Sequence, residues 1–264
     1  MHVVVCFAPI VDPKVPSDRL ALREDGCGLR GQGVGGILGP FDEAALEIAL
    51  KLRDVDPDTR ATAIMLGDVE DEACLRYALA LRVETGVRVD VDDEARWDQG
   101  AVCRALRQVI VTLDPPPDLV LVGREFGDRD DGVVPPFLAE CLGWRFFGLC
   151  HRAVRHAGEI VFVRALAASE EHAAFTPPVV ASVTNHPENR LRLPLLKNVL
   201  AAKRRPVMVV SAGAVTADRR VRAVAAEIVP AASRGRQRCR MLVGSSEAQA
   251  SELARFLVPW VRTA

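Results

Sequence analysis

The chain has 264 residues and a mass of 28.6 kDa, and its 49% hydrophobic and 26% charged residues are typical of a folded protein with a full apolar core. Lys and Arg number 34 and Asp and Glu 35, so the net charge is -1, and aromatic residues make up 5%. This balance gives no electrostatic basis for binding nucleic acid or a membrane surface, and it leaves few rings for base stacking. No apolar run reaches the roughly 20 residues of a membrane-spanning helix, and the first residues lack the basic region and cleavage site of a signal peptide.

Seven cysteines lie at wide spacings without a CxxC pair: Cys6, Cys27, Cys74, Cys103, Cys141, Cys150 and Cys239. The odd number argues against a disulfide framework, and no histidine lies at ligand spacing from a cysteine pair. We therefore expect a reduced, cytoplasmic chain without a metal site, whose cysteines act as small apolar side chains.

Strands and helices alternate over the first 145 residues. Strands are expected at 3–7, 61–66, 86–91 and 118–123, and helices at 71–81, 99–113 and 134–142, with a further helix starting after Pro40-Phe41-Asp42. Glu47 and Lys51 have the favourable spacing for an ion pair on that helix. The glycine-rich stretch 26–39 is interpreted as an excursion and not as a dinucleotide-binding fingerprint. The alternation predicts an α/β fold with an open, mostly parallel, Rossmann-like sheet flanked by helices.

The second half has a different texture. Short additional strands are expected at 151–154 and 160–164, paired as a hairpin around Ala157-Gly158, then at 178–184 and 207–211, with a final helix at 246–261. Residues 185–206 are polar and interrupted by prolines, and residues 212–240 are rich in arginine with little periodicity, which favours an extended C-terminal arm. We divide the chain into a nucleotide-binding-like domain at 1–211 and an arm with a helix at 212–264.

The pattern contains no hydrolase motif. Neither GxSxG nor HExxH occurs, and four histidines, expected as isolated surface residues, are unconnected to any nucleophile: His151, His156, His172 and His186. The acidic run 128–131 is either a solvated loop or part of a ligand site. Its position between a buried strand and a helix favours a ligand, because open α/β sheets bind ligands beyond the carboxyl ends of their strands.

Three segments, in order, resemble the β subunit of electron-transfer flavoproteins. Residues 40–50 are similar to that family's NPFDExALExAL segment, residues 123–144 to GKQAIDGDTGQVGPxLAExLGW, and residues 198–206 to NIMKAKKKP. A degraded form of the family signature lies at 163–180. The resemblance covers about 1–210.

This resemblance implies an electron-carrier subunit without substrate turnover of its own. The chain would pair with an α subunit that holds most of a shared FAD, and its segment 212–264 would pack on that subunit. Electrons would come from a flavin-dependent dehydrogenase and leave to a quinone reductase. The cofactor carries the chemistry, so the protein positions and tunes it.

The resemblance also assigns site residues. Phe41 would lie near the flavin ring, although on pattern alone it is equally a hydrophobic staple at the helix entry. Eleven positions match the family's AMP site: Cys6, Gly39, Pro40, Asp42, Leu66, Asp128, Asp130, Asp131, Gly132, Val133 and Val134. Four others match the loop that docks dehydrogenases, where the leucines could alternatively pack beneath the loop: Arg192, Leu193, Leu195 and Leu196.

Several departures fall on the AMP positions. Gly39 replaces the family's Asn, and the family's TGQVG is DGVVP here. Asp131 has the wrong charge for a phosphate, Val133 lacks a side-chain donor and Pro135 lacks a backbone N–H. We therefore expect the AMP pocket to be weak or empty. Two other functions stay open, a nucleotide-binding structural or sensing module and a bifurcating subunit with its own FAD, and the altered loop argues against both.

Overall fold

The computed structural model describes residues 1–16, 19–22, 29–31, 35–91, 98–127, 132–211 and 241–261. The chain divides into two compact units, residues 1–227 and 228–264. The predicted boundary near residue 212 falls outside the described residues.

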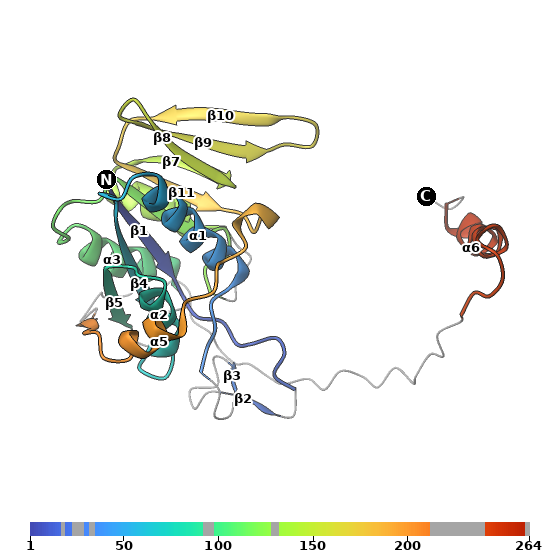
Figure 1. The fold of residues 1–264 in the computed structure, drawn as a ribbon, viewed down its shortest axis with the longest axis horizontal. Coiled ribbons are helices and arrows are strands. Elements are labelled where there is room, and N and C mark those ends of the chain that lie inside the picture. Colours follow the sequence, from blue (N-terminus) through green and yellow to red (C-terminus); the bar gives the residue numbers. More distant parts are fainter. Residues whose placement is uncertain are drawn as a thin grey trace. The chain divides into compact units, whose positions relative to one another are not determined.

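The first unit is built on a seven-stranded sheet with the order β12-β5-β4-β1-β6-β11-β7, and every pairing in it is parallel (Figure 1). Its strands are β1 (His2–Phe7), β4 (Arg60–Leu66), β5 (Thr85–Asp90), β6 (Leu119–Gly123), β7 (Arg145–Cys150), β11 (Val179–Val183) and β12 (Met208–Ser211). The predicted Rossmann-like α/β class is confirmed. The chain winds outward in both directions from β1, so the strand order reverses between β1 and β6, and such a switch point is where open α/β sheets bind ligands.

Helices cover both faces of the sheet: α1 (Pro40–Val55), α2 (Glu72–Ala80), α3 (Gln99–Ile110) and α4 (Val134–Leu142). Alternate residues of β1 face opposite layers, as the period of two of a strand requires. Val3, Val5 and Phe7 join the apolar cluster that contains α1 and α2 residues, whereas Val4 and Cys6 join the cluster that contains α3 and α4 residues. The short helix α5 (Leu196–Ala202), absent from the prediction, packs on α2.

A three-stranded antiparallel sheet contains β8 (Arg152–His156), β9 (Glu159–Ala165) and β10 (Glu170–Phe175). The predicted hairpin is confirmed, and Ala157 and Gly158 both have positive φ at its turn. Phe162 of β9 stacks on Phe147 of β7, with 5.3 Å between ring centroids, which joins this sheet to the core. A two-stranded sheet contains β2 (Leu20–Leu22) and β3 (Leu29–Gly31).

The second unit contains α6 (Ser246–Val261), as predicted. Leu253, Phe256, Leu257 and Val258 are each about half exposed. The predicted arm at 212–240 lies outside the described residues. Within the described part of the chain, no helix has the length and apolar character needed to cross a membrane.

The five described cysteines are free thiols, four of them buried. Burial raises the pKa of the Cys6, Cys74 and Cys150 thiols, the last two to about 12, so these groups stay protonated and act as apolar side chains. Cys27 and Cys239 lie outside the described residues.

Candidate functional site

The start of α1 lies at the switch point of the sheet. The chain leaves β1 and returns to α1 through an isolated bridge between Ile10 and Ile37. The backbone N–H of Gly36 donates to Asp71 Oδ1 over 2.9 Å, which ties this return to the start of α2. These contacts fix the segment Gly39-Pro40-Phe41-Asp42 beside the carboxyl ends of β1 and β6.

Gly123, the last residue of β6, allows α1 to approach closely. A Cβ atom at this position would lie 2.6 Å from Asp42 Oδ1 and 3.0 Å from Cβ of Phe41. The close approach of the two backbones therefore requires glycine at this position. The sequence match to the Gly-Lys pair of the family segment did not show this reason.

Asp42 is a buried acid, with 1% of its surface exposed. Burial raises the pKa of its carboxyl well above the usual range, and the charges of Glu125 and Glu43 add to this effect. The backbone N–H of Gly39 donates to the carboxyl, as in half of a capping box. Its Oδ1 atom has no hydrogen-bond partner among the described residues. Burial therefore favours the protonated form of Asp42, and its Oδ1 is an unused polar atom at the switch point.

Phe41 and Arg124 form a cation–π pair at the same place. The Arg124 guanidinium lies 5.1 Å from the centroid of the Phe41 ring, and Phe41 is 9% exposed. Arg124 also donates to Glu125 Oε1 over 3.0 Å, and its backbone N–H bonds Val183 O at the end of β11. The site thus offers a cation held on an aromatic face.

Cys6 and Leu66, the expected adenine-side residues, are buried in β1 and β4. The structure brings Cys6 close to Asp42, whose charge contributes to the raised pKa of the thiol after burial and Cys103. The side chains of Cys6 and Leu66 both belong to the apolar cluster on the face of the sheet that α3 and α4 cover.

The start of α4 is poor in hydrogen-bond donors. Val133 is its N-cap and makes no side-chain cap, and Val134 is the first helical residue. Pro135 and Pro136 follow and have no backbone N–H, so two of the amides that make a helix start attractive to phosphate are absent. Asp128, Asp130 and Asp131 lie outside the described residues. Among the described residues, the start of α4 therefore offers a phosphate fewer backbone donors than an ordinary helix start.

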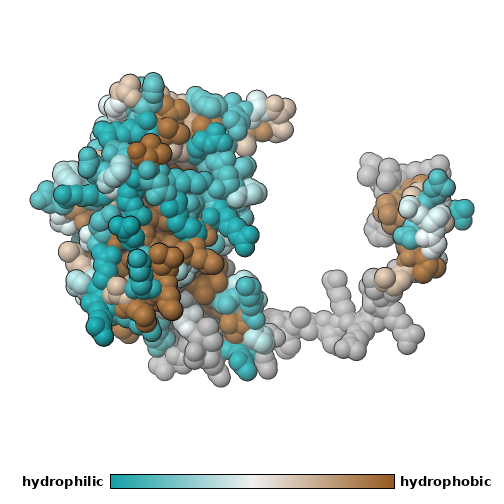
Figure 2. Space-filling model, viewed as in Figure 1, coloured by the Kyte–Doolittle hydropathy of each residue, from teal (hydrophilic) through white to brown (hydrophobic). Residues whose placement is uncertain are grey.

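The four expected docking residues divide into one anchor and three exposed side chains. Arg192 binds Glu47 and Asp54 of α1. Leu193, Leu195 and Leu196 are 84%, 60% and 74% exposed, so they lie on the surface and do not pack beneath the segment. Figure 2 shows apolar side chains on the face where the segment leading into α5 runs in Figure 1.

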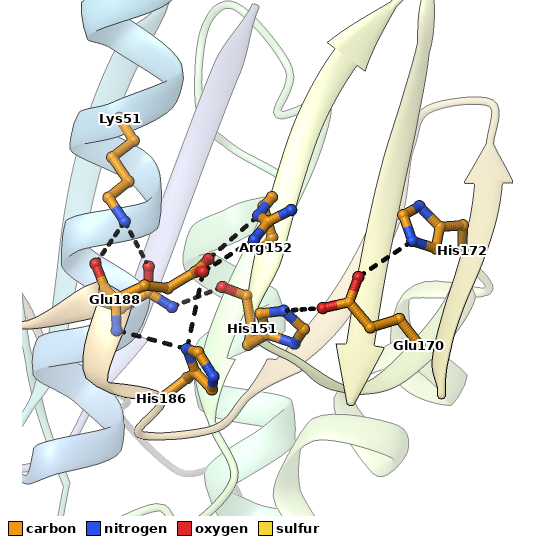
Figure 3. A network of polar contacts seen from close by, with 8 residues as sticks. Lys51, His151, Arg152, Glu170, His172, His186 and Glu188 are labelled. Atoms are coloured by element: carbon orange, nitrogen blue, oxygen red, sulfur yellow. Dashed lines mark hydrogen bonds and ion pairs between the residues drawn. The ribbon is translucent and has the colours of Figure 1, made fainter. Parts of the chain in front are cut away.

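His151 does not lie on the surface, and that prediction is wrong. It is 1% exposed, and its ring lies on that of His186 with 4.6 Å between centroids (Figure 3). It occupies the corner between β7 and β8, which the turn at His186 covers. Burial lowers the pKa of His151, and among the described residues its Nδ1 has no hydrogen-bond partner. His156 and His172 are exposed and His186 half-buried.

In the described part of the chain, no group of three or more His, Cys, Asp or Glu residues is arranged to hold a metal ion.

Residues 28–215 match the model of the electron transfer flavoprotein domain. The chain belongs to the electron transfer flavoprotein family. It is 30% identical over 209 residues to the electron transfer flavoprotein subunit beta of Syntrophomonas wolfei, covering 77% of this chain and 78% of the relative. It is also 31% identical over 156 residues to protein FixA of Azotobacter vinelandii, covering 58% and 54%. The acryloyl-CoA reductase electron transfer subunit gamma of Anaerotignum propionicum is 29% identical over 143 residues, covering 54% and 52%.

The expected resemblance to β subunits is confirmed, and the structure places the matching segments. The segments at 40–50 and 123–144 meet at the switch point through Phe41, Gly123 and Arg124. The segment at 198–206 lies elsewhere in this electron transfer flavoprotein chain. There Arg76 of α2 donates to the carbonyl oxygen of Ala202, and Arg205 donates to that of Leu79, so each arginine covers the end of the other helix.

Proposed function

We propose that this chain is the β subunit of a heterodimeric electron-transfer flavoprotein. It would relay electrons from a flavin-dependent dehydrogenase, through an FAD held mainly by an α subunit, towards a quinone reductase, in the cytoplasm and without substrate turnover of its own. The observation that carries the proposal is the Phe41–Arg124 pair at the switch point, within segments of the chain that match this family.

The residues at the switch point fit a flavin contributed largely by another subunit. FAD supplies the electron-transfer chemistry when it is bound. Phe41 offers an aromatic side chain, and Arg124, whose side chain is 39% exposed, offers a positive charge to an approaching cofactor. A fixed cation favours reduced flavin, which carries more negative charge, and the ring beneath it holds the guanidinium in place.

AMP binding is proposed to be weak or absent. The buried Asp42 carboxyl and the apolar, proline-containing start of α4 support this proposal, because a phosphate requires donors and positive potential. No step of the electron transfer is assigned to AMP.

The test is co-expression with an α subunit, followed by quantification of every bound nucleotide by mass and absorbance. We expect one FAD per heterodimer, reduction of that FAD by a dehydrogenase, and no flavin on this chain when it is purified alone. An FAD-replete monomer would contradict the proposal, and two FAD per heterodimer would favour the bifurcating alternative. A nucleotide-loaded chain that forms no complex with an α subunit would favour the sensing module.

A further inference from the structure

One face of α1 holds the segment that precedes the exposed leucines. Glu47, Lys51 and Asp54 are spaced at i, i+4 and i+7, so they share a face of the helix. Lys51 Nζ donates to Glu188 O over 2.6 Å and to Asn189 Oδ1 over 2.9 Å (Figure 3). These contacts replace the ion pair with Glu47 that the sequence predicts for Lys51.

Glu47 receives Arg192 instead. Nη2 of Arg192 lies 2.7 Å from Glu47 Oε1 and Nε lies 3.1 Å from Oε2, so the two side chains form a bidentate ion pair. The backbone N–H of Arg192 also donates to Glu47 Oε2, and Nη1 bonds Asp54 Oδ2 over 2.6 Å. Glu47 is 5% exposed, so its carboxylate depends on these donors. The same contacts raise the pKa of Arg192.

The segment is also held from the other side. Asn189, 3% exposed, donates through Nδ2 to His151 O over 2.6 Å. The Glu188 carboxylate binds Arg152 of β8, with 2.9 Å between Oε2 and Nη2, and this contact lowers the pKa of Glu188. Figure 3 shows Glu188 lying between Lys51 of α1 and Arg152 of the small sheet. Residues 188–192 are therefore fixed between two elements of the core.

The apolar side chains follow this fixed segment immediately. Leu193, Leu195 and Leu196 are exposed, so packing against the core does not hold their side chains in one arrangement. A surface that is ordered before it binds avoids the entropy loss of ordering on contact, which strengthens association. Phe41 lies in the first turn of α1, and Glu47 lies six residues, or about 9 Å, further along this helix. One rigid element thus connects the leucines to the switch point.

We propose that Glu47 and Arg192 are positioning residues that hold the leucine-bearing segment 193–196 ready to dock an electron-donating dehydrogenase. This inference rests on the proposed function of the chain as a carrier subunit. The pair acts on the encounter with the donor protein and does not touch the flavin.

The experiment uses the complex with the α subunit and measures its steady-state reduction by the donor dehydrogenase, with the complex as the varied substrate. We expect Glu47→Gln and Arg192→Gln each to raise KM about tenfold, as expected for loss of one charge-assisted hydrogen bond. Unchanged kcat, flavin content and flavin potential are expected alongside. The matched control is Arg155→Gln, which breaks a 2.9 Å pair with Asp56 at the end of the same helix but leaves the segment untouched.

Three outcomes overturn the inference. If KM stays within twofold of the wild type in both variants, the pair does not position the segment. If Arg155→Gln raises KM as much, the effect is general weakening of α1. If a variant loses flavin or falls in kcat, the pair supports the fold or the flavin. Should Glu47→Gln fail to assemble, Asp54→Asn tests the same anchor from its exposed side.

A substitution of one exposed leucine tests whether the Glu47–Arg192 pair acts through the docking segment. Leu195→Ala should also raise KM, and combining it with Glu47→Gln should give less than the product of the two effects, because both act on one surface. Independent, multiplying effects would contradict the inference. A wild-type complex that accepts no electrons from any dehydrogenase would instead overturn the proposed function, and this inference with it.

Discussion

Gly123 and Asp42 are packed so closely that a single added methyl group would place a carbon atom 2.6 Å from the Asp42 carboxyl. The contact joins the last residue of β6 to a residue in the first turn of α1 that lies 81 positions earlier in the chain. The switch point is therefore a tightly packed contact, and its geometry depends on the absence of a side chain.

Gly123→Ala is expected to lower the free energy of unfolding of the heterodimer by about 1–3 kcal/mol, a typical effect of overpacking. The new methyl group would push Asp42 and Phe41 away from β6, so flavin content should fall too. Urea unfolding and absorbance measure the two effects. Gly148→Ala is the matched control, because its nearest neighbour would be a Phe146 ring atom at 3.4 Å. Equal stability of the two variants would contradict the prediction.

Asp42→Asn is expected to raise stability at neutral and alkaline pH. The folded carboxyl has a raised pKa, so the unfolded state releases a proton that the folded state keeps, and stability falls as pH rises above the unfolded pKa of about 4. An amide removes this dependence and keeps an oxygen acceptor for the Gly39 N–H. Thermal unfolding between pH 5 and 9 measures the difference, with the exposed Glu159→Gln as the control. A destabilising Asp42→Asn would show that the carboxyl is ionised and paired.

His151 makes the fold sensitive to acid. Burial lowers the pKa of its imidazole, so the unfolded state takes up a proton first as pH falls. Stability is therefore lost as pH drops through about 6.5, with up to about 1.4 kcal/mol at stake for each unit of pKa difference. His151→Phe keeps a ring against His186 and should flatten the stability profile between pH 7 and 5. His156→Gln, on the exposed hairpin, should follow the wild-type profile; if His151→Phe follows it as well, another group is responsible.

Arg124→Gln is expected to lower the flavin potential of the heterodimer. Loss of a fixed positive charge disfavours the reduced cofactor, and a tenfold change in a one-electron equilibrium corresponds to about 59 mV. Arg124→Lys should show a smaller shift, because it keeps the charge but not the flat stacking on Phe41. Spectroelectrochemistry with and without 0.5 M salt gives the readout. An unchanged potential in Arg124→Gln would place the flavin away from this pair.

Local sequence patterns predicted most of the large sheet. Continuous apolar runs bounded by turn residues, such as 118–123, coincide with buried strands, and helical spacing located α1 to α4. β7, β10 and α5 were missed because tertiary contacts define them. β10 alternates in burial but consists of EEHAAF, and its pairing with β9 stabilises it.

The candidate site was only partly accessible from sequence. The resemblance to the family identified Phe41 and the segment 123–144 as site candidates. The local sequence did not show that Gly123 contacts Asp42 or that the Arg124 guanidinium lies over the Phe41 ring. Local spacing paired Glu47 with Lys51, because its partner in the structure, Arg192, lies 145 positions away in the chain. His151 looked exposed because its burial depends on the later turn at His186.

The last prediction concerns the nucleotide. If the Asp131 carboxylate comes within about 4 Å of the AMP phosphate, the two groups repel each other by on the order of 4 kcal/mol per unit charge pair at a surface-like dielectric. Losing a hydrogen bond to the charged group removes roughly 1.5–3 kcal/mol more, which together approach the roughly 8 kcal/mol of a micromolar affinity. The Arg124 guanidinium lies over Phe41 and donates to Glu125, and the proposed function assigns its charge to the flavin and not to a phosphate. The wild-type heterodimer should therefore release FAD without AMP on extraction. The triple variant Asp131→Thr, Val133→Gln, Pro135→Gly restores the family's loop residues and should gain AMP binding measurable by calorimetry. Asp12→Asn is the control, because it also removes a carboxylate but one that accepts from the backbone N–H of Lys14 in the turn after β1, and it should gain none. One equivalent of AMP in the wild-type complex would refute the prediction, and a triple variant that still binds none would show that the obstacle lies at Asp42 and not in the loop.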